Sequence, residues 1–207
     1  MGVDKREHIM STAVSLFATN GFEGTSVRDI AASADVNLAM INYYFGSKEK
    51  LFESIVEHNV SYTRSMLDEV ISNDDLTSMQ KIDKVIEIYV KRLFNGREFH
   101  KVLHQELMLN QRPELGEAIL NVLSKNSNAL RQIIETGIRK KEFKKVDVAL
   151  TIASLTGTLN AILLSKKICK LYLMKDDPTY TPYEDEALKK RVVEHLKQLM
   201  HAHLLKG

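Results

Sequence analysis

Apolar residues recur every three or four positions along almost the whole chain, the spacing that places them on one face of an α-helix. Ile9 and Phe17 mark the first such face. Asp4, with Glu7 three residues later, matches the pattern of a capping box, so we expect the first helix to begin there. Gly21 ends it, because glycine adopts a positive φ without steric cost.

Two short helices follow, separated by a tight break. Ser26 and Asp29 repeat the capping-box spacing, which predicts a second helix reaching about Ala34. Asn37 is a good N-cap for a third helix through Tyr44. A fourth, longer helix then begins near residue 47, so the chain opens with a group of short amphipathic elements.

The same apolar spacing predicts five further helices, which brings the total to about nine and the fold class to all-α. The start of the last one is marked twice, by Thr181 as cap and by Pro182 at the first helical position. The five helices are expected at residues 77–94, 98–109, 113–141, 147–173 and 182–205.

Composition supports a globular helical protein, since 44% of residues are hydrophobic and only three are proline. The net charge of +2 does not by itself indicate a nucleic-acid binder. Cys169 is the single cysteine and no leader pattern opens the chain, so we expect a protein of a reducing cytoplasm. Residues 148–165 carry no charge, but their Thr, Ser, Gly and Asn side chains favour a buried helix over a membrane span.

Two short helices with a tight break, the second one exposed and a longer helix behind it, are the arrangement that places a recognition helix in a DNA major groove. Thr25 and Ser26 bring hydroxyl and backbone N–H groups to a helix start, where a phosphate is favoured. Further side chains suited to phosphate or base-edge contacts are Arg28, Tyr43, Tyr44 and Lys48.

The stretch GFEGTSVRDIAASADVNLAMINYYFGSKEKLF resembles the DNA-binding domain of the TetR family. Its T-[ST]-V-R-D-I-A and Y-x-F-x-[ST]-K-E-x-L elements stand in the family's order and spacing. The resemblance implies a homodimer that places two recognition helices in successive major grooves of a near-palindromic operator on double-stranded DNA. It also implies a DNA-binding domain over residues 1–50, with the helix-turn-helix at about 27–46, and a larger helical ligand-binding and dimerisation domain over 51–207.

By the same resemblance, individual residues match positions with known roles. The positions that hold phosphates in the family are Thr25, Ser26, Arg28, Tyr44 and Lys48 here. The positions of the recognition helix that face the groove are Leu38, Ala39, Asn42 and Tyr43, and Asn37, the cap of this helix, is added to the DNA-binding set.

Asn42 departs from the family, which usually has an aromatic residue there. Because Asn pairs bidentately with adenine, we hypothesise that Asn42 reads an A·T pair. The alternatives are an exposed Asn42 without a role, Tyr43 or Tyr44 packed against the fourth helix, and Arg28 paired with an acid.

Small residues recur every four positions at Ala153, Gly157 and Ala161, which lets another helix approach closely. The final helix carries an apolar seam close to coiled-coil spacing. We predict that the two helices pair with their copies in a four-helix dimer interface, and packing of the same stripes within one chain is the alternative. The seam consists of Leu188, Val192, Leu196 and Leu199.

An apolar effector pocket is the other feature expected behind the DNA-binding domain. Flexible methionine and aromatic side chains suit varied ligands, although most such stripes are ordinary core. His100 and His104 have the spacing of two metal ligands but lack a clear third, so no metal and no cofactor is expected. The candidate pocket residues are Met66, Tyr89, Leu103, Leu107 and Met108.

These patterns together predict a sequence-specific transcriptional regulator, namely a repressor released from its operator by a small-molecule effector. A ligand-independent regulator or site-occluding factor of the same fold is the alternative. An enzyme is not expected, because the chain has no nucleophile–base arrangement and no glycine-rich phosphate loop.

Overall fold

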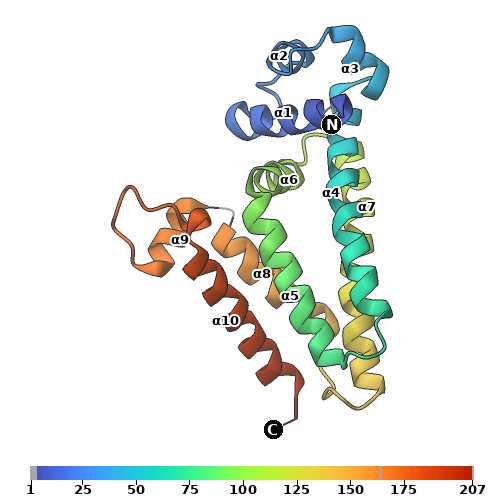
Figure 1. Ribbon diagram of the computed structural model, residues 1–207, viewed down its shortest axis with the longest axis vertical. Coiled ribbons are helices and arrows are strands. Elements are labelled where there is room, and N and C mark those ends of the chain that lie inside the picture. The colour runs from blue at the N-terminus through green and yellow to red at the C-terminus, as the bar shows by residue number, and fades with distance from the viewer. Residues whose placement is uncertain (1–3, 164, 207) are drawn as a thin grey trace. The chain divides into compact units, whose positions relative to one another are not determined.

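The computed structural model describes residues 4–163 and 165–206, and every regular element in this part of the chain is a helix (Figure 1). The predicted all-α class is therefore confirmed. The described residues form one α-helix more than the nine expected, and a short 3-10 helix η1. The elements are α1 (Lys5–Asn20), α2 (Val27–Ser33), α3 (Leu38–Phe45), α4 (Lys48–Ser72), α5 (Ser78–Asn95), α6 (Arg97–Leu109), α7 (Pro113–Arg139), α8 (Val148–Leu163), α9 (Lys166–Leu173), η1 (Pro182–Glu184) and α10 (Glu186–Leu204).

The first three helices begin and end where their capping residues predict. The side chain of Asp4 accepts the backbone N–H of Arg6, Ser26 and Asp29 form a complete capping box, and Asn37 caps α3. Gly21 ends α1 with φ at 77°. Side-chain oxygens thus supply the acceptors that the first N–H groups of a helix lack.

Two helix boundaries predicted in the second half of the chain are wrong. The single helix expected over 147–173 is broken, because the side chain of Ser165 caps a separate α9 by accepting the backbone N–H of Ile168. The last helix begins at Glu186 instead of Pro182. Asp185 is its cap and accepts two backbone N–H groups, whereas the Thr181 hydroxyl donates to the Glu184 carboxylate. A carboxylate is a stronger acceptor than a hydroxyl, so Asp185 sets the start.

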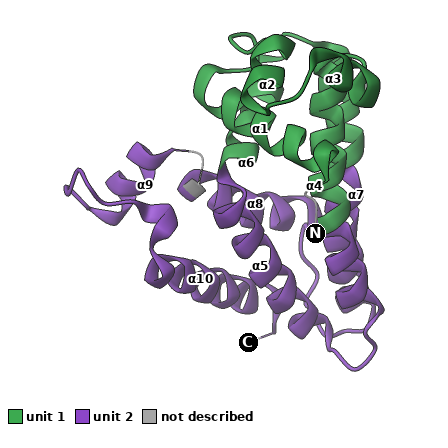
Figure 2. Ribbon diagram, turned by 45° about the horizontal axis from the view of Figure 1, so that its top comes forward, with its two compact units in different colours: residues 1–62, 98–123 green, residues 63–97, 124–207 purple. Residues whose placement is uncertain are grey.

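The chain folds into two compact units (Figure 2). The first comprises residues 1–62 and 98–123, so α6 and the beginning of α7 belong with the two short helices. Its core is aromatic at one end: the ring centroids of Phe17, Phe22 and Phe52 lie 5.0 to 5.8 Å apart. These contacts hold the loop after α1 against α4.

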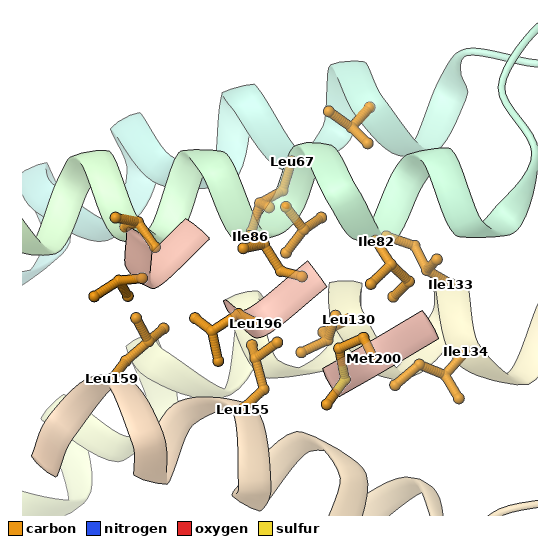
Figure 3. Close-up of a cluster of buried hydrophobic side chains, with 14 of the residues drawn as sticks. Leu67, Ile82, Ile86, Leu130, Ile133, Ile134, Leu155, Leu159, Leu196 and Met200 are labelled. Atoms are coloured by element: carbon orange, nitrogen blue, oxygen red, sulfur yellow. The ribbon is translucent and has the colours of Figure 1, made fainter. Parts of the chain in front are cut away.

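The second unit comprises residues 63–97 and 124–207 and has an aliphatic core (Figure 3). Two polar contacts along the edge of this core join α10 to α5: an ion pair of Lys197 with Glu87 at 2.6 Å, and a hydrogen bond of 3.0 Å between the His201 imidazole and the Asp83 carboxylate. Each buried aliphatic side chain contributes roughly 1.5 to 3 kcal/mol, so the core outweighs the exposed pairs. Its members on five helices include Leu67, Ile86, Leu130, Leu155 and Leu196.

Among the described residues, no single helix is both long and apolar enough to cross a membrane. Only the pair formed by α8 and α9, bent by 98°, meets the length and composition test when both are taken together.

Candidate DNA-binding surface

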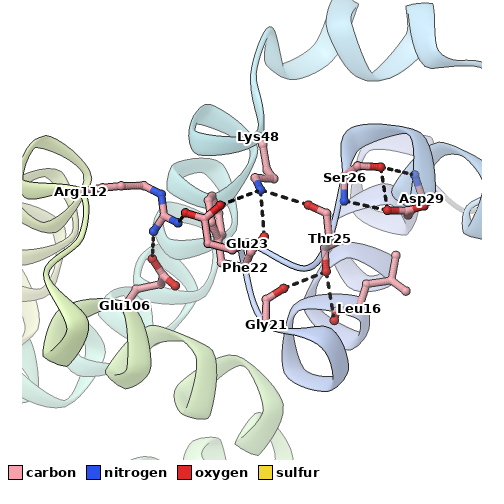
Figure 4. Close-up of polar contacts among 10 residues, drawn as sticks. All are labelled: Leu16, Gly21, Phe22, Glu23, Thr25, Ser26, Asp29, Lys48, Glu106 and Arg112. Carbon is pink, nitrogen blue, oxygen red and sulfur yellow. Dashed lines mark hydrogen bonds and ion pairs between the residues drawn. The ribbon is translucent and has the colours of Figure 1, made fainter.

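Ser26 and Asp29 shape the start of α2 (Figure 4). The Asp29 carboxylate accepts the Ser26 hydroxyl at 2.6 Å and its backbone N–H at 2.8 Å, and the Ser26 oxygen accepts the Asp29 N–H at 3.1 Å. The Ser26 hydroxyl, followed by its backbone N–H, holds the pKa of Asp29 below its usual value. The polar atoms of Ser26 are therefore engaged in the cap, although the residue itself is exposed.

Thr25 is buried, with only 1% of its surface exposed. Its hydroxyl lies 2.9 Å from the carbonyl oxygen of Gly21 and 3.3 Å from that of Leu16. The side chain thus ties the loop after α1 back to that helix, and a buried hydroxyl does not reach a phosphate.

Lys48 is directed inward at the first turn of α4, with 17% of its side chain exposed. Its ammonium donates to the carbonyl oxygens of Phe22 at 2.9 Å and Thr25 at 3.1 Å. It also lies 4.4 Å from the centroid of the Phe22 ring. These contacts fasten the loop before α2 to α4, which is a structural role for a side chain predicted to hold a phosphate.

The third helix separates a buried face from an exposed one. Ile41 and Phe45 are buried at 1% and 5%, and the guanidinium of Arg6 lies 5.4 Å from the Phe45 ring centroid. Asn37 accepts the Met40 N–H at 2.8 Å. The exposed residues predicted to face a groove, called here the α3 face, are Leu38, Ala39, Asn42 and Tyr43.

The two tyrosines of α3 differ in their surroundings. Tyr43 is 85% exposed, which excludes the packed alternative for its side chain. Tyr44 is 38% exposed, and its ring lies edge to face with that of Tyr43, with centroids 5.4 Å apart. Arg28 is also exposed, on α2. The exposed residues among those predicted to contact DNA are therefore the α3 face, Ser26, Arg28, Asn37 and part of Tyr44.

Sequence reasoning missed the residues that support this surface from behind. Glu23 precedes α2 and pairs with Arg112, which lies 89 residues further along the chain. Arg112 also binds Glu106 of α6 (Figure 4). No local spacing pairs residues so far apart, so no sequence signal was available for this contact.

The five candidate pocket residues fall in two units. Leu103 is buried in the core of the first unit, and Leu107 packs against that core. Met66 and Tyr89 belong to the second unit, where Tyr89 packs against the core. Met108 is 82% exposed, the reverse of the enclosed setting we expected, because it lies in the outward-facing last turn of α6.

The candidate dimer residues also divide into two groups. Ala153, Gly157 and Ala161 are exposed along α8. On α10, Leu199 is 37% exposed, whereas the rest of the seam is buried in the core of its own chain, the packing we had kept as an alternative. The buried seam residues are Leu188, Val192 and Leu196.

Comparison with known proteins places these features in a family. Residues 9–55 match the family described as bacterial regulatory proteins, tetR family. The curated protein named "Probable HTH-type transcriptional regulator YttP" of Bacillus subtilis is 30% identical over 193 residues, covering 91% of this chain and 92% of the relative. The HTH-type transcriptional repressor NicS of Pseudomonas putida is 30% identical over 177 residues, covering 81% and 74%.

A solved structure agrees with this likeness. The transcriptional regulator FadR from Bacillus subtilis, in complex with stearoyl-CoA, is 27% identical, with a TM-score of 0.72. The similarity covers 92% of this chain and 96% of FadR. Taken with the helix-turn-helix geometry and the near full-length relatives, these matches show that the chain belongs to the TetR family and is an HTH-type transcriptional regulator.

Proposed function

We propose that the protein is a homodimeric repressor that binds a near-palindromic operator on double-stranded DNA in the bacterial cytoplasm and is released by a small molecule. The observation that carries the DNA-binding role is the α3 face, which exposes Asn42 and Tyr43 while Ile41 and Phe45 anchor the same helix from behind. A helix that is packed on one face and exposes polar and aromatic side chains on the other is suited to lie in a DNA major groove. We assign DNA binding to residues 1–50, and the role is non-catalytic.

Selection of operator sequences by the wild-type protein from a random duplex pool tests this proposal. A near-palindromic sequence with half-sites about 10 base pairs apart, or a multiple of this, is expected. Recovery of no preferred sequence would contradict the proposed function.

Asn42 is the side chain we assign to base reading. Asn42→Ala is expected to weaken binding by about 1 to 3 kcal/mol for each half-site that has an A·T pair at the position it reads, and much less when that pair is changed. Gel-shift titrations of the wild-type and variant proteins on matched operators measure the difference. Equal weakening on every operator would assign Asn42 to positioning instead.

Dimerisation is proposed through the exposed stripe of Ala153, Gly157 and Ala161 on α8, together with Leu199 on α10. Small side chains at four-residue spacing allow close helix approach. A groove of about 590 Å³ adjoins the stripe between α8, α9 and α10, and both Ala161 and Cys169 line it. The surface therefore has both the flat stripe and the concavity that a second copy of the chain can fill.

The effector site is proposed in the second unit, near Tyr89 and Asn126. The Tyr89 hydroxyl donates to the Asn126 carbonyl oxygen at 3.4 Å, and burial raises the pKa of Tyr89 to about 12, so the phenol is neutral. The buried Oδ1 atom of Asn126 has no hydrogen-bond partner among the described residues. A buried acceptor without a partner costs about 1 to 3 kcal/mol, and an effector that donates to it would recover this energy.

Because the FadR structure contains stearoyl-CoA, we propose a long-chain acyl-CoA as the first effector to test. Stearoyl-CoA is expected to release wild-type protein from its selected operator in a gel shift. Asn126→Ala is expected to require a higher concentration, whereas Asn128→Ala, at an exposed position of the same helix, is expected to respond as wild type. If stearoyl-CoA has no effect on any of the three proteins, the proposed effector class is wrong.

A further inference from the structure

A cluster of charged side chains in the first unit joins segments that are distant in sequence (Figure 4). Arg112, which directly precedes α7, binds the carboxylate of Glu106 on α6 at 2.6 Å. Its second amino group binds Glu23, in the loop between α1 and α2. The other oxygen of Glu23 lies 3.9 Å from the ammonium of Lys48. Carboxylates and cations therefore alternate along the cluster, in the order Glu106, Arg112, Glu23 and Lys48.

The Arg112–Glu106 pair of this cluster is largely screened from solvent, whereas the carboxylate of Glu23 is 68% exposed. The side chains of Arg112 and Glu106 are 18% and 9% exposed. Burial raises the pKa of Glu106, and the positive charge of Lys48 offsets part of this increase. The Arg112 guanidinium lies 4.3 Å from the centroid of the Phe22 ring, and Phe22 is 3% exposed. The shielded Arg112–Glu106 pair is stronger than an exposed ion pair, and stacking on the Phe22 ring adds to it. These two contacts fix the guanidinium in the position from which its second amino group binds Glu23.

The loop that this cluster holds leads directly into the DNA-binding surface. It begins at Gly21, where φ is 77°, and ends at Ser26, the N-cap of α2. Lys48 binds two of its carbonyl oxygens from α4, and Arg112 binds Glu23 from the turn between α6 and α7. Because the loop is held from two sides, the start of α2 has a defined position and so does the turn that leads to α3.

We propose that Arg112 is a positioning residue for DNA recognition. By binding both Glu23 and Glu106, it fastens the loop between α1 and α2 to α6, and so sets the orientation of α2 and α3 without touching DNA. The clamp consists of Glu23, Lys48, Glu106 and Arg112. It makes the conformation of the turn between α6 and α7 a determinant of operator affinity. The DNA-binding consequence rests on the proposed function, whereas the clamp itself does not.

Hydrogen exchange of the full-length protein tests the clamp without any DNA. Arg112→Met keeps an unbranched apolar stem beside Phe22 but removes the charge, and Glu23→Gln changes an exposed carboxylate with little risk to folding. Both variants are expected to exchange amide hydrogens several-fold faster than wild type over residues 20–37, with residues 82–94 unchanged. The double variant is expected to exchange no faster than Arg112→Met alone, because both substitutions open the same contact.

Arg131→Met is the matched control, since Arg131 forms an exposed ion pair with Glu135 on α7 at 3.7 Å. It is expected to exchange as wild type. Unchanged exchange over residues 20–37 in both Glu23→Gln and Arg112→Met, or effects that simply multiply in the double variant, would overturn the clamp.

Operator binding tests the consequence for recognition. On a duplex selected by the wild-type protein, Arg112→Met is expected to bind roughly threefold to thirtyfold more weakly. Arg112→Lys, which keeps the charge but not the two-pronged guanidinium, is expected to recover part of that loss. Operator affinity equal to wild type in Arg112→Met would overturn the positioning role. If the wild-type protein selects no duplex, the proposed function fails, while hydrogen exchange still decides on the clamp.

Discussion

Arg28 and Lys48 carry the same charge in opposite surroundings. Arg28 is exposed on α2, whereas Lys48 is largely buried and donates to the carbonyl oxygens of Phe22 and Thr25. A cation that is already hydrogen-bonded to the backbone would have to break those bonds to reach a phosphate. We therefore expect Arg28 to contact DNA and Lys48 to stabilise the loop.

Substitution of the two cations separates these roles. Arg28→Ala is expected to leave stability within about 0.5 kcal/mol of wild type and to reduce the slope of log affinity against log salt by about 1.8, since one phosphate contact is lost in each of the two protomers of the proposed dimer. Lys48→Met is expected to lower the free energy of unfolding by about 1 to 2 kcal/mol and to keep the slope. Thermal unfolding and operator titrations over a salt series measure both. A reduced slope for Lys48→Met at unchanged stability would assign it to phosphate contact after all.

At the scale of single elements, the capping box of α2 makes stability depend on pH. The pKa of Asp29 lies below its ordinary value of 3.8 because Ser26 donates to the carboxylate. The carboxylate therefore stabilises the folded state above the unfolded pKa, and this contribution is lost as the pH falls through the folded pKa. The change of stability with pH is therefore confined to acid conditions, and the full contribution is present at neutral pH.

Asp29→Asn provides the test of the pH dependence. The difference in unfolding free energy between wild type and variant is expected to be constant above about pH 5 and to shrink at lower pH as the wild-type carboxylate is protonated. Denaturant unfolding at a series of pH values measures it. A difference that stays the same down to the acid limit would show that the charge of Asp29 does not stabilise the cap.

Within α7, position 137 requires glycine because the ring of Phe143 leaves no room for a side chain, and not because of its backbone angles. A Cβ atom there would lie 2.3 Å from a ring carbon of Phe143, which is 2% exposed. Gly137→Ala is expected to destabilise the protein by about 1 to 3 kcal/mol in thermal unfolding, despite the better helix propensity of alanine. Gly116→Ala is the control on the same helix, since its Cβ would meet Asn110 at an ordinary 3.5 Å. Equal stability of the two variants would contradict the packing argument.

At the scale of the whole molecule, the proposed dimer depends on a surface that the single chain leaves open. A Cβ atom at Gly157 would meet nothing within 4 Å, so Gly157→Leu is expected to fold normally and to dissociate the dimer at micromolar concentration. Asn128→Leu, at an exposed position of α7, is expected to remain dimeric. Sedimentation velocity and circular dichroism measure assembly and folding. A fully dimeric Gly157→Leu would remove α8 from the proposed interface.

Local sequence signals predicted the first three helices well because caps act within a few residues. Ser26, Asn37 and Gly21 form the expected helix ends. The same reasoning failed at Asp185, where two adjacent candidate caps competed and the carboxylate prevailed over Thr181. Periodicity also identified apolar stripes but not the helices against which they pack. Val192, predicted to lie in a dimer interface, packs in the core of its own chain.

The sequence by itself determined the helical class, the helix-turn-helix and the family likeness, since these depend on capping, apolar spacing and a contiguous motif. Only the tertiary structure decided which polar groups are free to act. In the folded chain, Thr25 and Lys48 point inward and Tyr43 is exposed. Folding also brings Arg112 into contact with Glu23, 89 residues earlier in the chain. Ion pairing and burial depend on which distant segments come together, and helical periodicity carries no information about that.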